Sequence, residues 1–215
     1  MPLGILTYHR DMKILVVGPS WVGDSVMAQT LYKRLKYENR DCIIDVMCPE
    51  WCLPLTNRMP EVNKGIISPY KHGEIGLISR YKYAKEIKEN AYDRSIILAN
   101  SLKSSLIPFF AQIPIRTGWL GEMRYFFLND IRKLKGERRN LMVEKFAALS
   151  IKKGDYSLEN LSFPSLQIDT ENQKIISNKY KINNDLPCLA ICPGAEFGPS
   201  KKWPSKFYAE VAKKY

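Results

Sequence analysis

Short apolar runs alternate with segments of helical spacing along the first half of the chain. Four runs are typical of buried strands, since they are short, apolar and bounded by turn-forming residues: residues 13–18, 42–48, 64–69 and 93–100. The segment that follows Asp24 places Val26, Leu31 and Leu35 at helical spacings. The chain therefore opens with a predicted strand, a glycine-containing loop and a helix.

Two further segments, residues 79–90 and 101–113, have the pattern of helices that lie between strands. Pro108 is expected to kink or shorten the second of these helices, because proline has no N–H to donate within a helix. Strands and helices that alternate at such spacing predict a parallel sheet covered on both faces. We therefore expect an α/β fold whose first domain is Rossmann-like.

The pattern changes in the last third of the chain. Residues 155–168 lose strong periodicity and carry polar residues and proline, as linkers between domains do. Beyond them we expect a helix at residues 171–182, an apolar strand at 187–194 and a second helix at 203–215, with Pro204 near its first turn. One strand and two helices cannot bury their apolar faces, so we interpret this part as an incomplete second domain.

Composition narrows the class of protein. The 33 Lys and Arg against 22 Asp and Glu give a net charge of +11, which favours anionic partners such as nucleic acid, phosphorylated sugars or a membrane surface. Charge alone does not choose among these partners. The five cysteines are odd in number and lie in or beside apolar runs, which argues against a disulfide framework. With no signal peptide or membrane span in the pattern, we expect a cytoplasmic protein.

The first glycine loop, GPSWVGDS, has the glycine spacing of a phosphate-binding P-loop, but Asp24 stands where that loop requires lysine. Ligands of open parallel sheets bind beyond the carboxyl ends of the strands, where this loop must lie. A carboxylate would repel phosphate, so an ATP-hydrolysing P-loop is disfavoured, whereas Asp24 suits proton removal from a hydroxyl group. The alternative is that Asp24 caps the following helix, and the pattern alone favours that alternative.

A second glycine loop, residues 192–204, carries Lys201 and Lys202 and also precedes a predicted helix. Such a loop suits an anion, but for an isolated Lys-Lys pair the pattern alone favours a solvated basic turn. Between the two loops, residues 116–139 interleave cations with aromatic side chains. That mixture suits a phosphorylated, membrane-anchored glycolipid, a nucleic acid, or a set of core aromatic residues beside a solvated basic face.

Several segments together carry a family resemblance: ILVVGPSWVGD, DVMCPEWCLPL, RMPEVN, PFFAQIPIRTGWLGEMRYFFLND and CPGAEFGPSKKWP. In this order they closely resemble the lipopolysaccharide heptosyltransferases, from about Met12 to Tyr215. The resemblance implies a GT-B fold, with two Rossmann-like domains and an active site in the cleft between them. It also implies that the family continues beyond the end of this chain. On this basis we divide the chain into four parts: an extra leader (residues 1–11), a first domain (12–154), a linker (155–168) and the start of a second domain (169–215).

The implied reaction is an inverting, metal-independent transfer of a heptose from ADP-heptose to the first heptose of the lipopolysaccharide inner core, on heptosyl-Kdo-lipid A. Asp24 matches the catalytic base of the family, which takes the proton of the attacking hydroxyl. Lys201, in the K-x-W-P pattern, matches the lysine that stabilises the leaving ADP, and Gly194 is expected to lie at the start of the following helix, where neighbouring N–H groups help bind the donor. The resemblance implies no metal and no cofactor besides the donor substrate.

The acceptor is expected to lie on the first domain. Gly23 would leave room for its close approach, and Arg116 and Arg124 would contact its acidic groups. The resemblance places the protein at the cytoplasmic face of the inner membrane, as a peripheral protein with no nucleic-acid partner. Two other interpretations remain: a truncated, non-catalytic half that binds only the acceptor, and a basic nucleic-acid-binding protein, which the segment matches make remote.

Overall fold

The computed structural model describes residues 11–70, 75–133, 141–151, 161–183, 185–195 and 198–214. It divides into two compact units, Met1–Gln167 and Ile168–Tyr215. The predicted leader, except for Asp11, lies outside the described residues, as does most of the first half of the predicted linker. Residues 161–167 of that linker belong to the first unit, where Leu166 packs against the core and Gln167 N–H donates to the Arg58 carbonyl.

The first unit is built on one parallel sheet, whose strands are β1 (Lys13–Val17), β2 (Ile43–Cys48), β3 (Lys64–Ile67), β4 (Arg94–Ile97), β5 (Ile115–Trp119) and β6 (Asp130–Arg132). Their order across the sheet is β3-β2-β1-β4-β5-β6, and all neighbours run parallel. The four predicted strands are confirmed, while β5 and β6 are additions that the apolar pattern did not indicate. The order reverses between β1 and β4, which is the position where open parallel sheets bind ligands.

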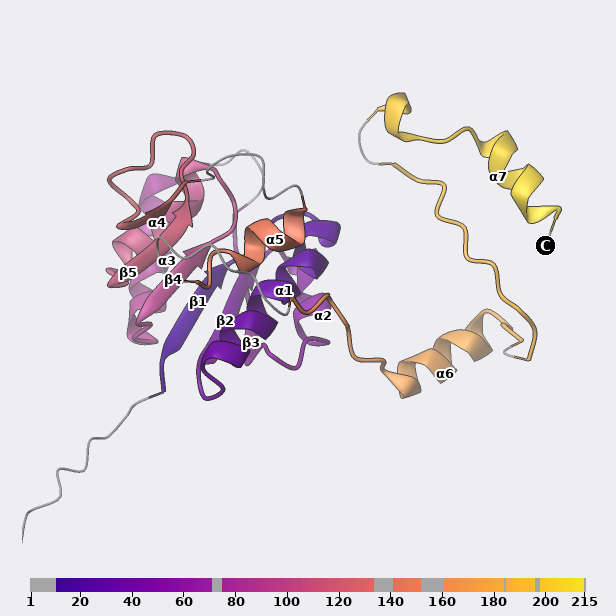
Figure 1. The fold of residues 1–215 in the computed structure, drawn as a ribbon, viewed down its shortest axis with the longest axis horizontal. Coiled ribbons are helices and arrows are strands. Elements are labelled where there is room, and N and C mark those ends of the chain that lie inside the picture. Colours follow the sequence, from indigo (N-terminus) through magenta and orange to yellow (C-terminus); the bar gives the residue numbers. More distant parts are fainter. Residues whose placement is uncertain are drawn as a thin grey trace, which may run out of the picture. The chain divides into compact units, whose positions relative to one another are not determined.

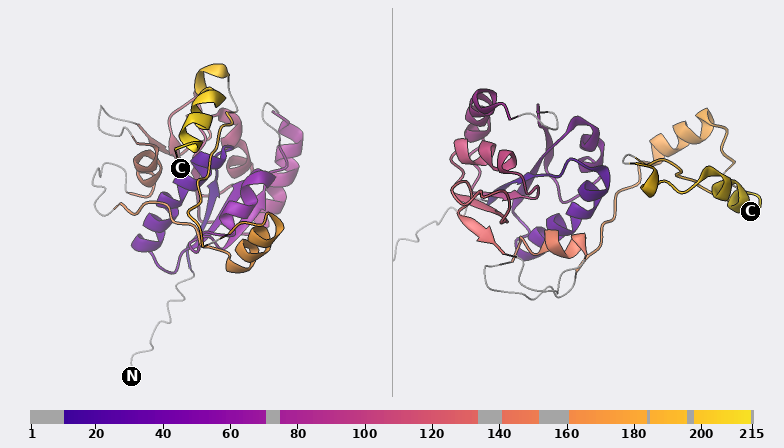
Figure 2. Two further views of the ribbon diagram at one scale, coloured as in Figure 1. Left: turned by 90° about the vertical axis from the view of Figure 1, so that its right-hand side faces the viewer. Right: turned by 90° about the horizontal axis from the view of Figure 1, so that it is seen from above.

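The helices of this unit are α1 (Val22–Glu38), α2 (Leu53–Thr56), α3 (Leu77–Glu89), α4 (Leu102–Phe110) and α5 (Met142–Ala147), with a 3₁₀ turn at Glu50–Cys52. Helices α1 and α5 pack together on one face of the sheet, and α3 and α4 cover the other (Figures 1 and 2). Alternation along β1 serves both layers, because Ile14 and Val16 face α1 while Leu15 faces α3 and α4. The predicted sheet with two covered faces is thus confirmed.

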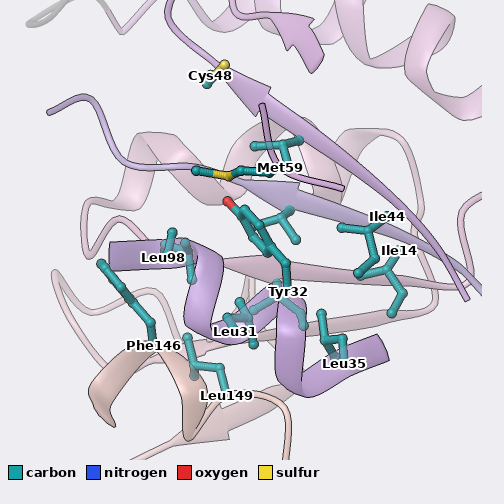
Figure 3. Packing of buried hydrophobic residues seen from close by; sticks show 14 of the residues in the cluster. Ile14, Leu31, Tyr32, Leu35, Ile44, Cys48, Met59, Leu98, Phe146 and Leu149 are labelled. Carbon is teal, nitrogen blue, oxygen red and sulfur yellow. The ribbon is translucent and has the colours of Figure 1, made fainter. Parts of the chain in front are cut away.

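Helix α4 ends at Phe110, three residues before the end of the predicted segment, and Pro108 lies within it. Figure 3 shows the layer under α1, where Tyr32 lies among apolar side chains of the sheet and of α5. Tyr32 is 1% exposed, and burial raises the pKa of its hydroxyl far above the usual value. Each large apolar side chain buried here contributes about 1.5–3 kcal/mol. This core holds the carboxyl edge of the sheet in place.

The second unit contains α6 (Thr170–Lys179), a 3₁₀ turn at Pro199–Lys201 and α7 (Ser205–Ala212). Asp169 caps α6 by accepting a hydrogen bond from Asn172 N–H at 2.9 Å. The predicted strand at residues 187–194 is wrong: the backbone there is irregular and the side chains are exposed. A strand needs a paired neighbour, and the described residues of this unit supply none.

Candidate functional site

The loop between β1 and α1 lies at the carboxyl edge of the sheet. Gly18 N–H donates to the Met47 carbonyl at 2.8 Å, and a Cβ at Gly18 would lie only 3.1 Å from that same oxygen. Glycine therefore lets the loop cross close to β2. Farther along the loop, the Trp51 indole donates to the Ser20 carbonyl at 2.9 Å. These contacts fix the path of the chain into α1.

Asp24 lies in the first turn of α1, but it is not the N-cap residue, which is Trp21. The interpretation of Asp24 as the cap of this helix is therefore wrong; the pattern placed the helix start after Asp24, whereas α1 begins two residues earlier. The side chain is half-buried, and no hydrogen bond or ion pair joins its carboxylate to another described residue. The acidic group is thus available to accept a proton at the ligand-binding edge.

Gly23 precedes Asp24 and is exposed. No atom among the described residues lies within 4 Å of the position that a Cβ would take there, so its backbone faces open space. This agrees in geometry with the expected close approach of an acceptor, a role that stays a prediction.

A pocket of about 90 Å³ opens at the same edge, where the strand order reverses. The ends of β1 and β2 and the loop between β4 and α4 line it, together with residues of α3 and α4. Two of the lining residues, Arg80 and Lys103, are cations that the sequence pattern did not indicate as site residues. Lys103 could have been found by the rule that selected Asp24, because it too follows a predicted strand at the start of a helix.

Arg124 was expected to contact acidic groups of an acceptor, but it is fully buried. Its Nη1 donates to the Ala99 carbonyl at 2.6 Å, to the Ser101 carbonyl at 3.3 Å and to Ser104 Oγ at 3.1 Å. Nε and Nη2 both donate to the Trp119 carbonyl. Burial lowers the pKa of Arg124 to about 10, partly opposed by the charge of Glu122, so the side chain keeps its charge at neutral pH. In this structure Arg124 holds the loop between β4 and α4.

Arg116 is half-buried and also contacts the protein's own backbone. Its Nε donates to the Phe127 carbonyl at 2.8 Å and its Nη1 to the Ile113 carbonyl at 2.7 Å, while the guanidinium lies 5.5 Å from the centre of the Phe109 ring. Burial lowers the pKa of Arg116. The segment after β5 leaves Phe126 74% exposed on the same aromatic cluster, so the cation and the apolar surface adjoin.

Lys201 and Gly194 belong to the second unit. Lys201 is exposed at the end of the 3₁₀ turn, and Trp203 stacks on Phe207 of α7 with ring centres 5.5 Å apart. Gly194 lies in irregular chain, and no described atom lies within 4 Å of its Cβ position. It is separated from α7, which begins at Ser205, so the expected position at a helix start is wrong.

Two kinds of feature are absent from the described residues. No group of three or more His, Cys, Asp or Glu side chains gathers there as a set of metal ligands. No helix in the same part of the chain combines the length and the apolar character that a membrane crossing requires.

Comparison with known proteins gives concordant results. The signature of glycosyltransferase family 9 (heptosyltransferase) matches residues 80–215. Lipopolysaccharide heptosyltransferase 2 of Escherichia coli is 48% identical over 207 residues, and lipooligosaccharide heptosyltransferase 2 of Haemophilus ducreyi is 45% identical over 210 residues. Each alignment covers 94% of this chain, but the chain spans only 60% and 59%, respectively, of these curated relatives.

Among solved structures, the E. coli ADP-heptose LPS heptosyltransferase II matches with a TM-score of 0.85 and 46% identity. The match covers 94% of this chain and 61% of that one. The likeness confirms the predicted fold class, α/β of GT-B type.

Proposed function

Because the chain belongs to glycosyltransferase family 9, the heptosyltransferases, we propose that it transfers a heptose from ADP-heptose to the first heptose of the lipopolysaccharide inner core, on heptosyl-Kdo-lipid A. In this proposal the transfer inverts the anomeric centre and uses no metal. The names of the relatives support heptosyl transfer, and the name of the structurally matched enzyme supports an ADP-linked donor.

The observation that carries the proposal is the Asp24 carboxylate in the first turn of α1, which has no partner among the described residues and lies beside the exposed Gly23. Asp24 acts as the general base: it takes the proton from the acceptor hydroxyl as that oxygen attacks the anomeric carbon. The C–O bond to the diphosphate breaks, and the electron pair leaves with ADP. The open backbone at Gly23 lets the acceptor oxygen come close to the carboxylate.

Donor binding is assigned to the second unit. Lys201 is exposed and would place its ammonium beside the diphosphate, whose negative charge rises as the sugar leaves. Gly194, with no described neighbour at its Cβ position, would let the backbone approach the nucleotide. With a lysine to neutralise the leaving group, the proposed step has no need of a metal ion.

Acceptor binding is assigned to the first unit, through Gly23 and Arg116. Arg124 enters this proposal as a positioning residue, because its donors hold the loop between β4 and α4. The exposed Phe126 and Tyr125 beside Arg116 would rest against the headgroups of the inner membrane, on its cytoplasmic side, as expected for a peripheral protein that acts on a glycolipid. We propose no nucleic-acid partner.

The test is heptose transfer itself, read as the mass increment on heptosyl-Kdo-lipid A after incubation with ADP-heptose. We expect Asp24→Asn to lower the rate by about 10²–10⁴-fold, the range for loss of a general base. The matched control is Asp41→Asn, at an exposed carboxylate in the loop between α1 and β2, which should leave the rate unchanged. Equal rates for the wild type and Asp24→Asn would refute the assigned base. Acceptor binding without any transfer would instead identify the chain as an acceptor-binding half.

A further inference from the structure

The pocket at the reversal of strand order is positively charged. Arg80 comes from α3 and Lys103 from α4, and both line it. None of its described lining residues carries a carboxylate. Gly18 and Ser20, from the loop that leads to Asp24, form part of the same wall. An anion in this pocket would therefore lie next to the turn that carries the proposed base.

The protein holds the Arg80 side chain in place, whereas the Lys103 ammonium is available to a ligand. Arg80 is only 5% exposed, its guanidinium lies 3.9 Å from the centre of the Tyr70 ring, and its Nε donates to the Ile75 carbonyl at 2.6 Å. Lys103 is half-buried, and its ammonium makes no hydrogen bond or ion pair with another described residue. A cation in the first turn of a helix also opposes the helix dipole, so stability does not explain a lysine at this position.

The loop that leads into α4, just before Lys103, is held in place by hydrogen bonds. Arg124 donates to the Ala99 and Ser101 carbonyls of this loop, and the Glu122 carboxylate accepts a hydrogen bond from Leu102 N–H at 2.7 Å. Such a frame places the start of α4 before any ligand arrives, which lowers the entropy cost of binding.

We propose that this pocket binds an acidic group of the acceptor glycolipid, a carboxylate or a phosphate, through Lys103 and Arg80. The proposal rests on the function proposed above and adds to it the part of the acceptor that the first unit recognises. A water needs roughly 10–15 Å³ of cavity volume. The pocket of about 90 Å³ thus holds several waters or one acidic group, but not a whole oligosaccharide.

The first experiment uses small anions, so that it does not depend on transfer. The lysines of the 215-residue chain are ¹³C-methylated reductively, which keeps their charge, and the Lys103 signal is assigned as the one absent from Lys103→Arg. Inorganic phosphate and glucuronate are titrated separately, with glucose as the neutral control. We expect one of the two anions to shift the Lys103 signal saturably, with a dissociation constant on the order of millimolar.

Lys85 is the internal control, because it is exposed on α3 with its ammonium 4.9 Å from the Tyr81 ring centre. A saturable shift confined to Lys103 supports the pocket, and the anion that causes it distinguishes a phosphate site from a carboxylate site. No saturable shift at Lys103, or an equal shift at Lys85, overturns the proposal and leaves the proposed transfer reaction untouched.

The second experiment links the pocket to the acceptor. We expect Lys103→Met to weaken binding of de-O-acylated heptosyl-Kdo-lipid A by about tenfold or more, because it removes a charged hydrogen-bond donor from the pocket. Lys85→Met should bind as the wild type does, and equal unfolding temperatures would show that both variants are folded. Unchanged affinity in Lys103→Met refutes this pocket as the acceptor's anion site. Anion binding in the pocket without any acceptor binding refutes that assignment and, with it, the acceptor proposed above.

Discussion

At the residue scale, environment decides what a charged side chain does. The sequence predicts a site role for both Asp24 and Arg124, but Asp24 has no described partner whereas every nitrogen of the Arg124 guanidinium donates to the protein. Buried carbonyls that lose such a donor keep their full desolvation cost. The same type of prediction therefore leads to a candidate base in one case and to a structural residue in the other.

Replacing Arg124 should therefore destabilise the first unit. We expect Arg124→Met to lower the free energy of unfolding by about 3–5 kcal/mol, because the carbonyls of Trp119, Ala99 and Ser101 lose their charged donor. At roughly 2–4 °C per kcal/mol, the unfolding temperature should fall by about 6–20 °C. Arg124→Lys should recover little of this loss, because one ammonium cannot replace the guanidinium donors to both the Trp119 and the Ala99 carbonyls. Thermal unfolding followed by circular dichroism measures the unfolding temperature of each variant. A fall of less than about 2 °C, which corresponds to less than about 1 kcal/mol, would contradict the structural role.

Gly23 gives the opposite prediction. Because no described atom lies within 4 Å of its Cβ position and it occupies the first turn of α1, Gly23→Ala should leave the unfolding temperature equal or slightly higher. If an acceptor approaches this backbone, the added methyl should raise the KM for the acceptor several-fold while the KM for the donor is unchanged. Steady-state kinetics with each substrate varied in turn separates the two, and an unchanged acceptor KM would exclude Gly23 from the acceptor site.

At the scale of elements, apolar runs predicted β1 to β4, because each of these strands contains two or more consecutive apolar residues. Strands β5 and β6 did not stand out, because polar side chains and a glycine interrupt their apolar residues. In the folded chain a network of hydrogen bonds satisfies those groups: Thr117 Oγ1 donates to Asp130 at 2.9 Å, Arg132 donates to both Asp130 oxygens, and Arg94 donates to Thr117 Oγ1. Such long-range pairing cannot be deduced from local spacing.

The strand predicted at residues 187–194 is wrong for the reverse reason, since there the composition indicates a strand that the fold does not form. Their apolar composition is typical of a strand, but a strand forms only where a neighbouring strand pairs with it through hydrogen bonds.

The candidate site was predictable only in part, because some of its residues come together only in the folded chain. Asp24 and Gly23 follow the first strand in the sequence, whereas Arg80 and Lys103 line one pocket because α3 and α4 pack together on the same face of the sheet.

The β5–β6 network predicts how stability depends on pH. Burial by itself would raise the pKa of Asp130, but hydrogen bonds from Arg132 and Thr117 and the charges of Arg132 and Arg94 lower it below the usual range. A carboxyl with a lowered pKa in the folded state stabilises fully above its unfolded value of about 3.9, and this contribution is lost as the pH falls through the folded value. Asp130→Asn should thus cost about 1–3 kcal/mol at pH 7, and the deficit should shrink below about pH 4.

Urea unfolding between pH 7 and pH 3 measures the Asp130 prediction. Asp41→Asn is the control, because its side chain is exposed and a change there should remain within about 0.5 kcal/mol at every pH. A deficit for Asp130→Asn that stays constant down to pH 3 would show that the carboxylate charge contributes nothing to the network.

At the scale of the whole molecule, the two units differ in how their chain is stabilised. In the first unit, helices cover both faces of the sheet, and a cluster of buried apolar side chains lies on each face. In the second, the only buried residue among those described is Ser177, whereas Leu186, Leu189 and Trp203 are exposed. Since tertiary packing supplies most of the stability of helices, stability in this chain is concentrated in the first unit.

Hydrogen exchange should reveal this difference directly. Isolated helices shorter than about 12–15 residues are marginal in water, and α6 and α7 have 10 and 8 residues. We expect their amides to exchange at close to the rate of an unstructured peptide, while the amides of β1 and β4 are protected up to the free energy of global unfolding. Mass spectrometry of peptides after pulse labelling resolves the two classes. Protection of α7 equal to that of β1 would mean that the second unit is stabilised by packing, because helix propensity alone cannot supply that protection.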